Sequence, residues 1–286
     1  MGAALSIIIV TRPTRLEGLR AQWATTGQAK FRLASAHAAE EVLRAAETPT
    51  GVKARAGKKP ATHDADFSEY QQEDATYQRA VAAVERQLDF GLPVKRLARE
   101  FVTTFDFRRA ALVVVVGQDG LVANTAKYVG GLPIIAVNPD PRRIDGVLLP
   151  FQVPQVRTAA DRVLSRRYQS QAVTLAEVEL NDGQRMLAFN DFFLGAASHV
   201  SARYLLEFGG KQEPQSSSGI LVSTGAGSTG WMSSVFNMTC GIASFLGAPL
   251  DESMRLDRSD RELLWAVREP FVSKQSRANL VAGVLK

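Results

Sequence analysis

The sequence predicts an α/β N-terminal domain with a parallel sheet, followed by a β-rich, β-sandwich-like C-terminal domain. In the first half, three continuous apolar runs are separated by helical patterns, which indicates parallel strands covered on both faces. After Pro150, apolar and polar residues alternate instead, which is typical of antiparallel strands with one face in water. We therefore place the domain boundary near residue 148, with the α/β domain over 1–148 and the β-rich domain over 149–286.

The composition is that of a globular protein that needs no disulfide or metal to support its core. Of 286 residues, 45% are hydrophobic and 22% are charged, and Cys240 is the only cysteine, which excludes a disulfide framework and a cysteine-based zinc site. No apolar run approaches the roughly 18 residues of a membrane span, so we expect no membrane partner and a cytoplasmic protein. The net charge of +5 suits anionic ligands. The sequence has no long Lys/Arg block with interleaved aromatic residues, so we expect no nucleic-acid partner.

The first part of the chain predicts one strand and two helical stretches around a loop. Residues 6–10 form a short apolar run that predicts a buried strand, and residues 16–44 favour helix. Residues 48–74 mix Pro, Gly and charged side chains without apolar periodicity, which predicts a surface loop. Over 76–88 apolar residues return at helical spacing.

The next segment predicts a parallel crossover unit. Residues 110–116 give the strongest strand signal in the chain and end in Gly117-Gln118-Asp119-Gly120. Residues 121–129 predict a helix, and residues 133–137 predict another buried strand. A strand, a helix and a strand in this order pair in parallel.

The second half predicts antiparallel strands. The alternating residues 172–180 and 185–189 flank Asn181-Asp182-Gly183, which predicts a hairpin turning at Asp-Gly. Further strands are expected over residues 187–194, 202–208 and 263–267.

The Gly117–Gly120 turn is the first candidate site. In open α/β sheets ligands bind at the carboxyl ends of strands, and the following helix N-terminus favours an anion such as phosphate. Gly117 and Gly120 would let the backbone approach a ligand, and Asp119, a carboxylate without an evident packing role, would suit Mg²⁺ or accept a proton from a hydroxyl. The alternative is a tight strand-to-helix turn that Asp119 caps.

The stretch Ser223–Trp231 is the second candidate site. Three glycines alternate with four hydroxyl side chains after the apolar residues 219–222, which suits phosphate or ribose oxygens. The sequence fits neither a Walker A loop nor the G-x-G-x-x-G dinucleotide motif. A plain flexible loop is the alternative.

Asn190 and Asp191 form the third candidate site. They follow Phe189 and precede Phe192-Phe193, and polar side chains in apolar surroundings need hydrogen-bond partners. A ribose diol would satisfy both side chains, whereas a simple turn is the alternative.

These three motifs, in this order, resemble the NAD kinase superfamily. That family has a Gly-Gly-Asp-Gly-Thr motif, an Asn-Glu/Asp motif and a Thr-Pro-Thr-Gly-Ser-Thr-Ala-Tyr-like loop. The resemblance is closest to the branch that includes the mitochondrial-type NAD kinases. Residues that carry the branch resemblance are 11–17, 138–143, Gly146, 217–219 and 267–270.

The resemblance implies transfer of phosphate from ATP to the 2′-hydroxyl of the adenosine ribose of NAD, which gives NADP. ATP and NAD would be substrates, Mg²⁺ the expected cofactor, and the protein a homodimer or homotetramer. Asp119 would act as the base or as the Mg²⁺ organiser. Phosphates would contact Gly117, Gly120, Gly227 and Ser228. NAD ribose or nicotinamide groups would bind Asn190 and Asp191, and the adenosine side would be lined by Thr229, Gly230 and Trp231.

The chain departs from the family pattern at named positions. Gln118 stands for the second glycine of the Gly-Gly-Asp-Gly-Thr motif, Leu121 stands for the threonine, and Trp231 stands for the tyrosine. Gln118 adds bulk, and its amide would either crowd the phosphate donor or contact it; we favour contact. Two alternatives therefore stay open: a kinase of the same superfamily acting on a sugar or lipid hydroxyl, and a non-catalytic nucleotide-binding protein. Compared with the family, the second domain is expected to be shortened after residue 270.

Overall fold

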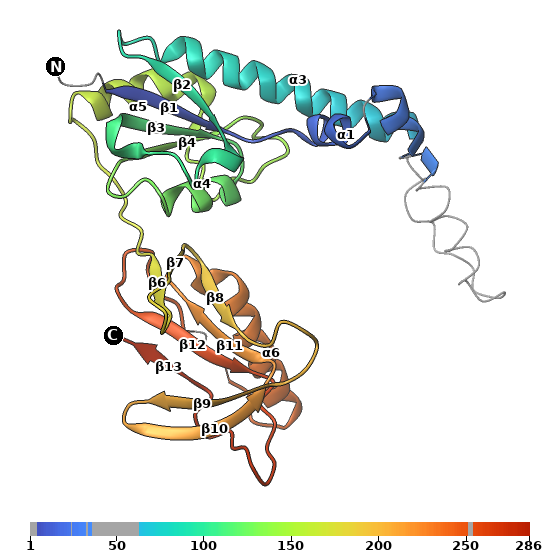
Figure 1. Cartoon of the computed structure of the whole chain (residues 1–286), viewed down its shortest axis with the longest axis vertical. Helices are drawn as coiled ribbons and strands as arrows, with labels where there is room; N and C mark the ends of the chain where they lie inside the picture. The colour runs from blue at the N-terminus through green and yellow to red at the C-terminus, as the bar shows by residue number, and fades with distance from the viewer. Residues whose placement is uncertain (1–4, 24, 33, 36–62, 251–253) are drawn as a thin grey trace. The chain divides into compact units, whose positions relative to one another are not determined.

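The computed structural model describes residues 5–23, 25–32, 34–35, 63–250 and 254–286. The chain splits into two compact units, Met1–Tyr168 and Gln169–Lys286 (Figure 1), and each is described by itself. The sequence places the boundary near residue 148, about one helix earlier than this division. Helix α5 (Val156–Leu164) lies between the two positions and packs on the sheet of the first unit.

Five parallel strands form the sheet of the first unit among its described residues, in the order β2-β1-β3-β4-β5. Their bounds are Ser6–Thr11 (β1), Val94–Ala98 (β2), Ala110–Val116 (β3), Ile134–Asn138 (β4) and Phe151–Gln152 (β5). The order along the sheet reverses between β1 and β3, and in open α/β sheets this is where ligands bind, outside the carboxyl ends of the strands. The expected α/β class and parallel sheet are confirmed.

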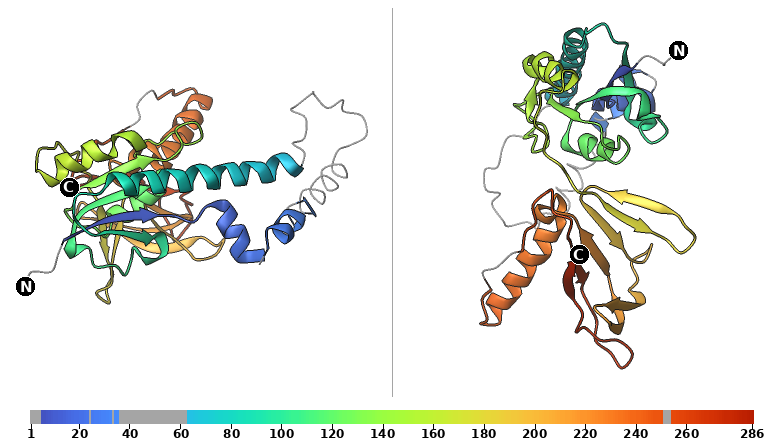
Figure 2. Two further views of the ribbon diagram at one scale, coloured as in Figure 1. Left: turned by 90° about the horizontal axis from the view of Figure 1, so that it is seen from above. Right: turned by 90° about the vertical axis from the view of Figure 1, so that its left-hand side faces the viewer.

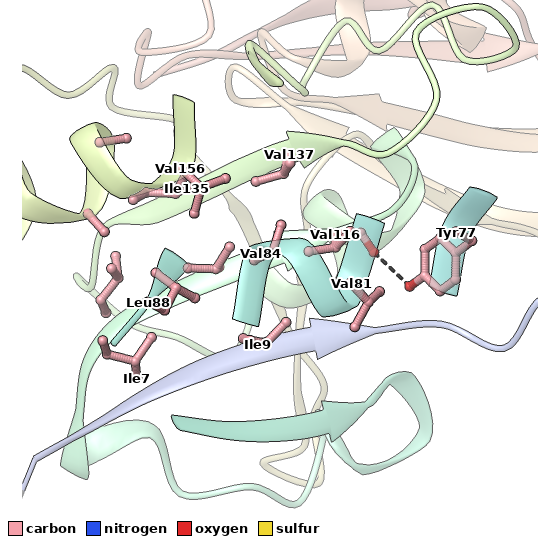
Figure 3. Close-up of a cluster of buried hydrophobic side chains, with 14 residues drawn as sticks. Ile7, Ile9, Tyr77, Val81, Val84, Leu88, Val116, Ile135, Val137 and Val156 are labelled. Carbon is pink, nitrogen blue, oxygen red and sulfur yellow. Dashed lines mark hydrogen bonds between the residues drawn. The ribbon is translucent and has the colours of Figure 1, made fainter. Parts of the chain in front are cut away.

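Helices cover both faces of this sheet. Ile7 and Ile9 face α3 (His63–Gln87) and α5, whereas Ile8 and Val10 belong to the cluster on the opposite face with α4 (Asp119–Ala126). These four residues of β1 are fully buried, which is why the strand has a continuous apolar run in the sequence. Figure 3 shows the cluster between the sheet and α3.

Helix α3 corrects the loop predicted over residues 48–74. The helix already begins at His63, while residues 48–62 lie outside the described residues. Its first half extends beyond the sheet and lies beside α1 (Arg15–Trp23), as Figures 1 and 2 show. This half buries one apolar side chain, Phe67, and its other contacts are mainly polar, so it lacks the repeated apolar spacing on which the prediction relied.

The rest of the first unit contains shorter elements. The helical stretch expected over 16–44 is seen as α1 and as helical residues 26–32 and 34–35; residues 24, 33 and 36–44 lie outside the described part. Strand β2 was not predicted, because it is an edge strand with a single buried residue, Leu97. Short 3₁₀ helices cover Arg99–Phe101 (η1), Phe107–Arg109 (η2) and Val153–Gln155 (η3).

The described part of the second unit contains a four-stranded antiparallel sheet in the order β13-β12-β11-β8, together with two hairpins. The sheet strands are Asp191–Leu194 (β8), Gly219–Ser223 (β11), Leu263–Arg268 (β12) and Ala282–Leu285 (β13). The hairpin strands are Ala176–Glu179 (β6), Arg185–Ala188 (β7), Ala202–Phe208 (β9) and Lys211–Ser217 (β10). The hairpin predicted at Asp182-Gly183 is confirmed, with Gly183 at φ +83°. The single strand predicted over 187–194 is instead divided between β7 and β8, and Phe189-Asn190 interrupt it.

One helix, α6 (Trp231–Phe245), packs on the sheet of the second unit (Figure 2) and was not predicted. Its buried residue Met232 belongs to the same hydrophobic cluster as Leu221 of β11 and Leu264 of β12. A 3₁₀ turn, η4 (Gly227–Thr229), comes directly before the helix. In the part of the chain that the structure describes, no helix is long and apolar enough to cross a membrane.

Candidate functional site

The Gly117–Gly120 turn joins the carboxyl end of β3 to the N-terminus of α4. Gly117 is buried, its N–H donates to the carbonyl of Val137 at 3.3 Å, and a Cβ atom at this residue would lie 2.8 Å from Leu121 Cδ2. A glycine at 117 therefore lets α4 pack closely on the strand. Gly120 is exposed, and a Cβ there would meet no described atom within 4 Å, so packing does not require a glycine at 120.

Asp119 has a structural contact that the sequence analysis did not expect. Its Oδ1 accepts a hydrogen bond of 2.6 Å from the backbone N–H of Leu148, which holds the loop before β5 against the first turn of α4. Its Oδ2 makes no hydrogen bond among the described residues. The carboxylate is thus oriented through one oxygen, and its negative charge lies at the favourable end of the helix dipole.

The structure places Gln118 at the N-cap position of α4 in an extended conformation. Its side chain does not cap the helix and makes no hydrogen bond to any described residue. Gln118 is exposed and lines a pocket of about 310 Å³. The Gln118 side chain therefore lines a specific cavity.

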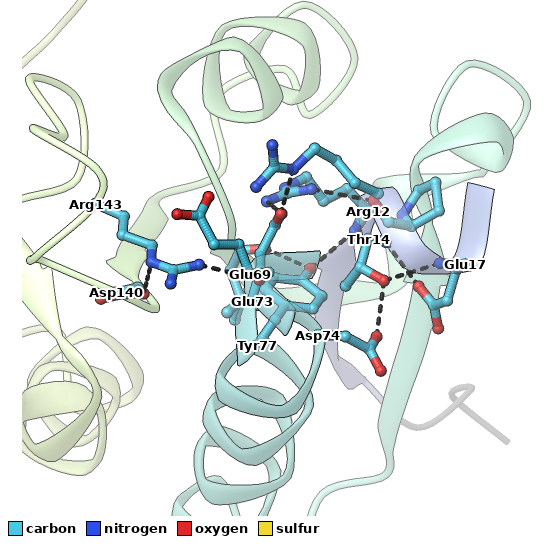
Figure 4. Close-up of polar contacts among 12 residues, drawn as sticks. Arg12, Thr14, Glu17, Glu69, Glu73, Asp74, Tyr77, Asp140 and Arg143 are labelled. Carbon is cyan, nitrogen blue, oxygen red and sulfur yellow. Dashed lines mark hydrogen bonds and ion pairs between the residues drawn. The ribbon is translucent and has the colours of Figure 1, made fainter. Parts of the chain in front are cut away.

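This pocket, here called the arginine pocket, lies at the carboxyl ends of β1, β3 and β4. It is lined by Arg12, Arg15, Glu73, Tyr77, Gln118, Pro139, Asp140, Arg143 and Ile144. Figure 4 shows Glu73 and Tyr77 in the middle, with Arg143 and Asp140 on one side and Arg12 on the other. All of these residues belong to the first unit, and the pocket occupies the point at which the strand order reverses.

Glu73 of α3 joins the two arginines that follow β1. Arg12 donates from Nη2 to Glu73 Oε1 at 3.0 Å, and Arg15 donates from Nε to Oε2. Burial acts to raise the pKa of Glu73, but the hydrogen bonds from Arg15 and Arg12 outweigh it and hold the pKa below its ordinary value. Glu73 is therefore ionised at neutral pH and keeps both guanidinium groups at the pocket.

Tyr77 ties the ends of two strands together beneath the pocket. Its hydroxyl accepts from the Arg12 backbone N–H at 2.9 Å. It also donates to the Val116 carbonyl at 2.9 Å, the bond drawn in Figure 3. The Arg12 guanidinium also lies 5.2 Å from the centre of the Tyr77 ring. Burial raises the pKa of Tyr77, so its hydroxyl keeps the proton that it donates to Val116.

The start of α1 is fixed by a reciprocal capping box. The Thr14 N–H donates to Glu17 Oε2 at 2.7 Å, and the Glu17 N–H donates to Thr14 Oγ1 at 3.2 Å. The Thr14 hydroxyl in turn donates to Asp74 of α3 at 2.7 Å. These bonds hold Arg15 at the edge of the pocket.

The loop after β4 forms the other wall. Buried Asn138 donates from Nδ2 to the Ile144 carbonyl at 2.9 Å and accepts from the Asp140 N–H at 3.0 Å, which fixes the loop. Arg143 donates to the Glu69 carbonyl at 3.3 Å and lies 3.9 Å from Asp140. The positive φ of Gly146 (+68°) closes this loop.

In the second unit, the Asn190–Asp191 pair and the glycine loop come together. The Thr224 N–H donates to the Asn190 carbonyl at 2.9 Å, and a Cβ at Gly227 would lie 2.3 Å from that same oxygen. Asp191 pairs with Ser223 in the register of β8 and β11. Two motifs more than thirty residues apart in the sequence thus form one cluster.

The polar groups of this pair differ in their surroundings. Asn190 is exposed, and its side chain makes no hydrogen bond among the described residues. Asp191 is half-buried, its Oδ1 is buried without a hydrogen-bond partner among those residues, and burial raises its pKa against a smaller opposing effect of Ser223. The Asp191 carboxylate is thus costly to bury and only partly satisfied by the described residues.

The glycine loop divides into an inner and an outer part. Ser228 is fully buried, and its hydroxyl donates to the Gly225 carbonyl at 2.8 Å, so it stabilises the loop itself. Thr229, Gly230 and Trp231 are exposed. The Trp231 ring, 41% exposed, stacks on Phe193 at a centroid distance of 5.3 Å. The phosphate role of Gly227 and Ser228 stays a prediction, and the structure adds an internal role for both.

Among the described residues, no three His, Cys, Asp or Glu side chains gather into a group that could hold a metal ion. Mg²⁺ needs less than such a group, because it commonly binds one or two carboxylates and takes its remaining oxygens from substrate phosphates and water. Asp119, with one carboxylate oxygen outside the bond to Leu148, fits that minimal requirement.

Sequence reasoning singled out the glycine motifs but missed the arginine pocket. Residues 11–17 and 138–143 entered only through the resemblance to a family branch, and Glu73 fell within the predicted loop. One feature of the sequence could have indicated the pocket, because in both segments arginines follow the end of a buried strand.

No family model matches this chain, and no curated protein matches it. Among solved structures, it is similar to yeast NADH kinase in complex with NADH, with 15% identity and a TM-score of 0.46 over 99% of this chain and 75% of that one. It is also similar to an NAD kinase from Archaeoglobus fulgidus in complex with ATP, with 16% identity and a TM-score of 0.46 over 73% of this chain and 72% of that one.

Proposed function

We propose that this protein is an NAD kinase-like phosphotransferase of the mitochondrial-type branch, which transfers phosphate from ATP to the 2′-hydroxyl of the adenosine ribose of NAD. The observation that carries the proposal is the place of the Gly117–Gly120 turn. It lies at the carboxyl end of the central strand β3, at a helix N-terminus and beside the arginine pocket. Backbone N–H groups, a helix dipole and guanidinium groups all favour phosphate. The type of reaction is inferred from the resemblance of the three sequence motifs to those of NAD kinases.

In this proposal Asp119 handles the proton of the attacking hydroxyl. The 2′-oxygen attacks the terminal phosphorus of ATP, the bond from that phosphorus to the bridging oxygen breaks, and ADP leaves. The hydroxyl proton passes to Asp119 Oδ2, while Oδ1 stays bonded to Leu148 and keeps the carboxylate in position. In the alternative role, Asp119 would hold Mg²⁺ through Oδ2 instead of taking the proton, and the metal would neutralise charge on the phosphates of ATP.

The second unit would hold the NAD substrate. Asn190 and Asp191 offer an amide and a carboxylate that suit a ribose diol, because each can bond a hydroxyl group. The exposed residues Thr229, Gly230 and Trp231 would line the adenosine side. Asp191 is only half-buried, so part of its carboxylate stays accessible to a diol, which is a reason to assign NAD to this cluster.

A second candidate function is nucleotide binding without turnover. It is favoured by the bond from Leu148 to Asp119, which gives the carboxylate a structural use, and by Leu121, which is buried in the core where the family has a hydroxyl. This candidate predicts binding of NAD or ATP and no product.

A coupled assay for NADP formation tests the proposal, with purified wild-type protein, ATP, Mg²⁺ and either NAD or NADH. Turnover by wild type and its loss in Asp119→Asn are expected. A thermal-shift series with NAD, NADH, ATP and sugars runs in parallel. Ligand stabilisation without NADP formation would favour the non-catalytic binder, and phosphate transfer to a sugar or lipid hydroxyl instead would identify a different kinase of the superfamily.

A further inference from the structure

We propose that the arginine pocket is a subsite for an oligophosphate chain, in which Arg15, Arg143 and the Gln118 carboxamide contact phosphate oxygens and Arg12 positions the site. The inference deepens the proposed function, and only the identity of the nucleotide rests on that function. Phosphate binding by the pocket is tested by itself.

The position of the pocket is the first reason. Arg12 and Arg15 follow β1, Gln118 follows β3, and Arg143 follows β4, so three adjacent strand ends contribute side chains to one cavity. At this point the order of the strands reverses, and the sheet leaves a crevice that ligands of open α/β folds occupy.

The second reason is charge. The lining of the pocket contains the guanidinium groups of Arg12, Arg15 and Arg143 and the carboxylates of Glu73 and Asp140, a net positive charge. Planar guanidinium groups bond phosphate oxygens in pairs, which makes arginine well suited to a phosphate chain.

Two of the arginines are exposed enough to exchange their partners. The Arg15 side chain is 54% exposed although it pairs with Glu73, and exposed ion pairs contribute little to stability. Arg143 lies 3.9 Å from Asp140, at the outer limit of an ion pair, and its other bonds go to the Glu69 carbonyl and the Gln72 side chain. A phosphate chain, with a higher charge than either carboxylate, would compete for both guanidinium groups.

Arg12 differs, because it is built into the fold. Its side chain is 13% exposed, it lies over the Tyr77 ring, and it pairs with Glu73. Its Nε is buried and has no hydrogen-bond partner among the described residues. Burial and these contacts fix Arg12 in place, so it positions the wall of the pocket rather than exchanging its partners.

Gln118 links the pocket to the Gly117–Gly120 turn. Its exposed carboxamide has no partner among the described residues and lines the cavity. A glycine at this position would offer only its backbone N–H, whereas the carboxamide adds two donor hydrogens. Gln118, which stands where the family motif has a glycine, would then add a phosphate contact in the pocket to those made by the backbone of the turn.

A purely structural cluster is the competing explanation. In that case Arg15, Glu73 and Arg143 only hold α1 and the loop after β4 against α3. Their loss would then lower the unfolding temperature without a specific change in phosphate binding, and Gln118 variants would have no effect.

Titration calorimetry on the full chain separates these explanations, with inorganic tripolyphosphate, ATP and NAD as probes. The variants are Arg143→Gln and Gln118→Ala, and the matched control is Arg142→Gln, an exposed neighbour that does not line the pocket. Gln118→Ala removes no internal hydrogen bond, so its folding is secure if Arg143→Gln proves unstable. Thermal unfolding of each variant is recorded beside the titrations.

We expect Arg143→Gln to weaken tripolyphosphate and ATP binding by about tenfold or more, the loss of a charge-assisted bond. Gln118→Ala should weaken binding less, and Arg142→Gln should match wild type. A loss confined to NAD would assign the pocket to the pyrophosphate of the dinucleotide. No tripolyphosphate, ATP or NAD binding by wild type, or equal losses in Arg142→Gln and Arg143→Gln, would overturn the subsite.

The NADP assay keeps the two proposals distinguishable. If Arg143→Gln loses tripolyphosphate binding while wild type forms no NADP, the subsite stands and the kinase proposal fails. If wild type forms NADP and Arg143→Gln keeps its ATP affinity and KM, the kinase proposal stands and the subsite fails.

Discussion

Gly227 lies against Asp191 so closely that a Cβ atom at residue 227 would be 2.6 Å from Asp191 Oδ1. The glycine loop therefore folds directly onto the Asn190–Asp191 pair. Two motifs that the sequence offers as separate candidates belong to one cluster of the second unit, and the glycine between them is required by the packing of the chain.

Gly227→Ala should destabilise the second unit, because the added methyl group would collide with the Asn190 carbonyl and the Asp191 carboxylate. Overpacking of this kind costs about 1–3 kcal/mol. Urea unfolding measures it, with Gly241→Ala as control, since a Cβ at 241 meets no described atom within 4 Å. Equal stability of Gly227→Ala and wild type would contradict this packing.

Gly120→Ala should separate stability from function. Gly120 lies in α4 with open space around its Cα, so alanine should raise helix stability by about 0.5–1 kcal/mol. If the backbone at 120 approaches a phosphate, the methyl group should reduce NADP formation in the same variant. Unfolding curves and initial rates on one preparation check both, and unchanged rates would remove Gly120 from the site.

Asp191→Asn should stabilise the protein at neutral pH. Burial raises the pKa of Asp191 above its unfolded value, so ionisation opposes folding: the contribution of this group to stability is full below its ordinary pKa and is lost as the pH rises through the folded pKa. The variant should gain a few degrees in Tm at pH 7.5, and this gain should vanish near pH 3. Asp257→Asn, an exposed control, should show neither effect.

The same Asp191→Asn variant should bind NAD less well. Its KM for NAD should rise much more than its KM for ATP, because only one substrate loses a hydroxyl contact. Equal changes for both substrates would indicate that the Asn190–Asp191 pair is only a turn at the start of β8.

Asp119→Asn and Asp119→Ala should differ in stability but not in activity. The asparagine keeps an oxygen that accepts from Leu148, whereas alanine leaves that N–H without its 2.6 Å partner and should cost about 1 kcal/mol. Both remove the base, so the phosphoryl-transfer rate should fall by about 10²–10⁴-fold in each. Near-wild-type turnover in Asp119→Asn would show that the carboxylate serves only the loop.

Tyr77→Phe should loosen the strand ends below the pocket. The ring remains, but the Arg12 N–H and the Val116 carbonyl lose their shared partner, at a cost of about 1–3 kcal/mol. Chemical unfolding compares it with Tyr70→Phe, whose hydroxyl makes no hydrogen bond among the described residues. A similar small loss in both variants would argue against the bridge.

The parallel sheet was predictable because its strands are buried on both faces. Val113–Val116 contain no polar residue to weaken the signal, and the turn after them can only lie at the carboxyl edge of the sheet. The first half of α3 was not predictable in this way. Apart from the buried Phe67, its contacts are mainly with polar groups at the start of α1, and apolar periodicity carries no information about such contacts.

The motif residues of the candidate site could likewise be identified from the sequence, whereas the residues of the arginine pocket could not. Glu73 lies 61 residues from Arg12, and the two meet only because α3 passes the end of β1. Nothing local in either segment indicates the pairing. The closeness of Gly227 to Asp191 depends in the same way on the register of β8 and β11.

Helix α3 continues without interruption for 25 residues, yet its two halves are supported by different forces. From Tyr77 onward, Val81 and Val84 are sealed in the apolar core, so their amides should exchange with deuterium only when the whole unit unfolds. Before Tyr77 the helix buries only Phe67, and its protection depends largely on ionic and hydroxyl contacts with residues at the start of α1, such as Thr14 to Asp74. One continuous ladder of hydrogen bonds should therefore show two levels of exchange protection. A ligand that draws Arg15 away from Glu73 would change the exchange protection of the half before Tyr77. It would leave the protection of the half after Tyr77 unchanged.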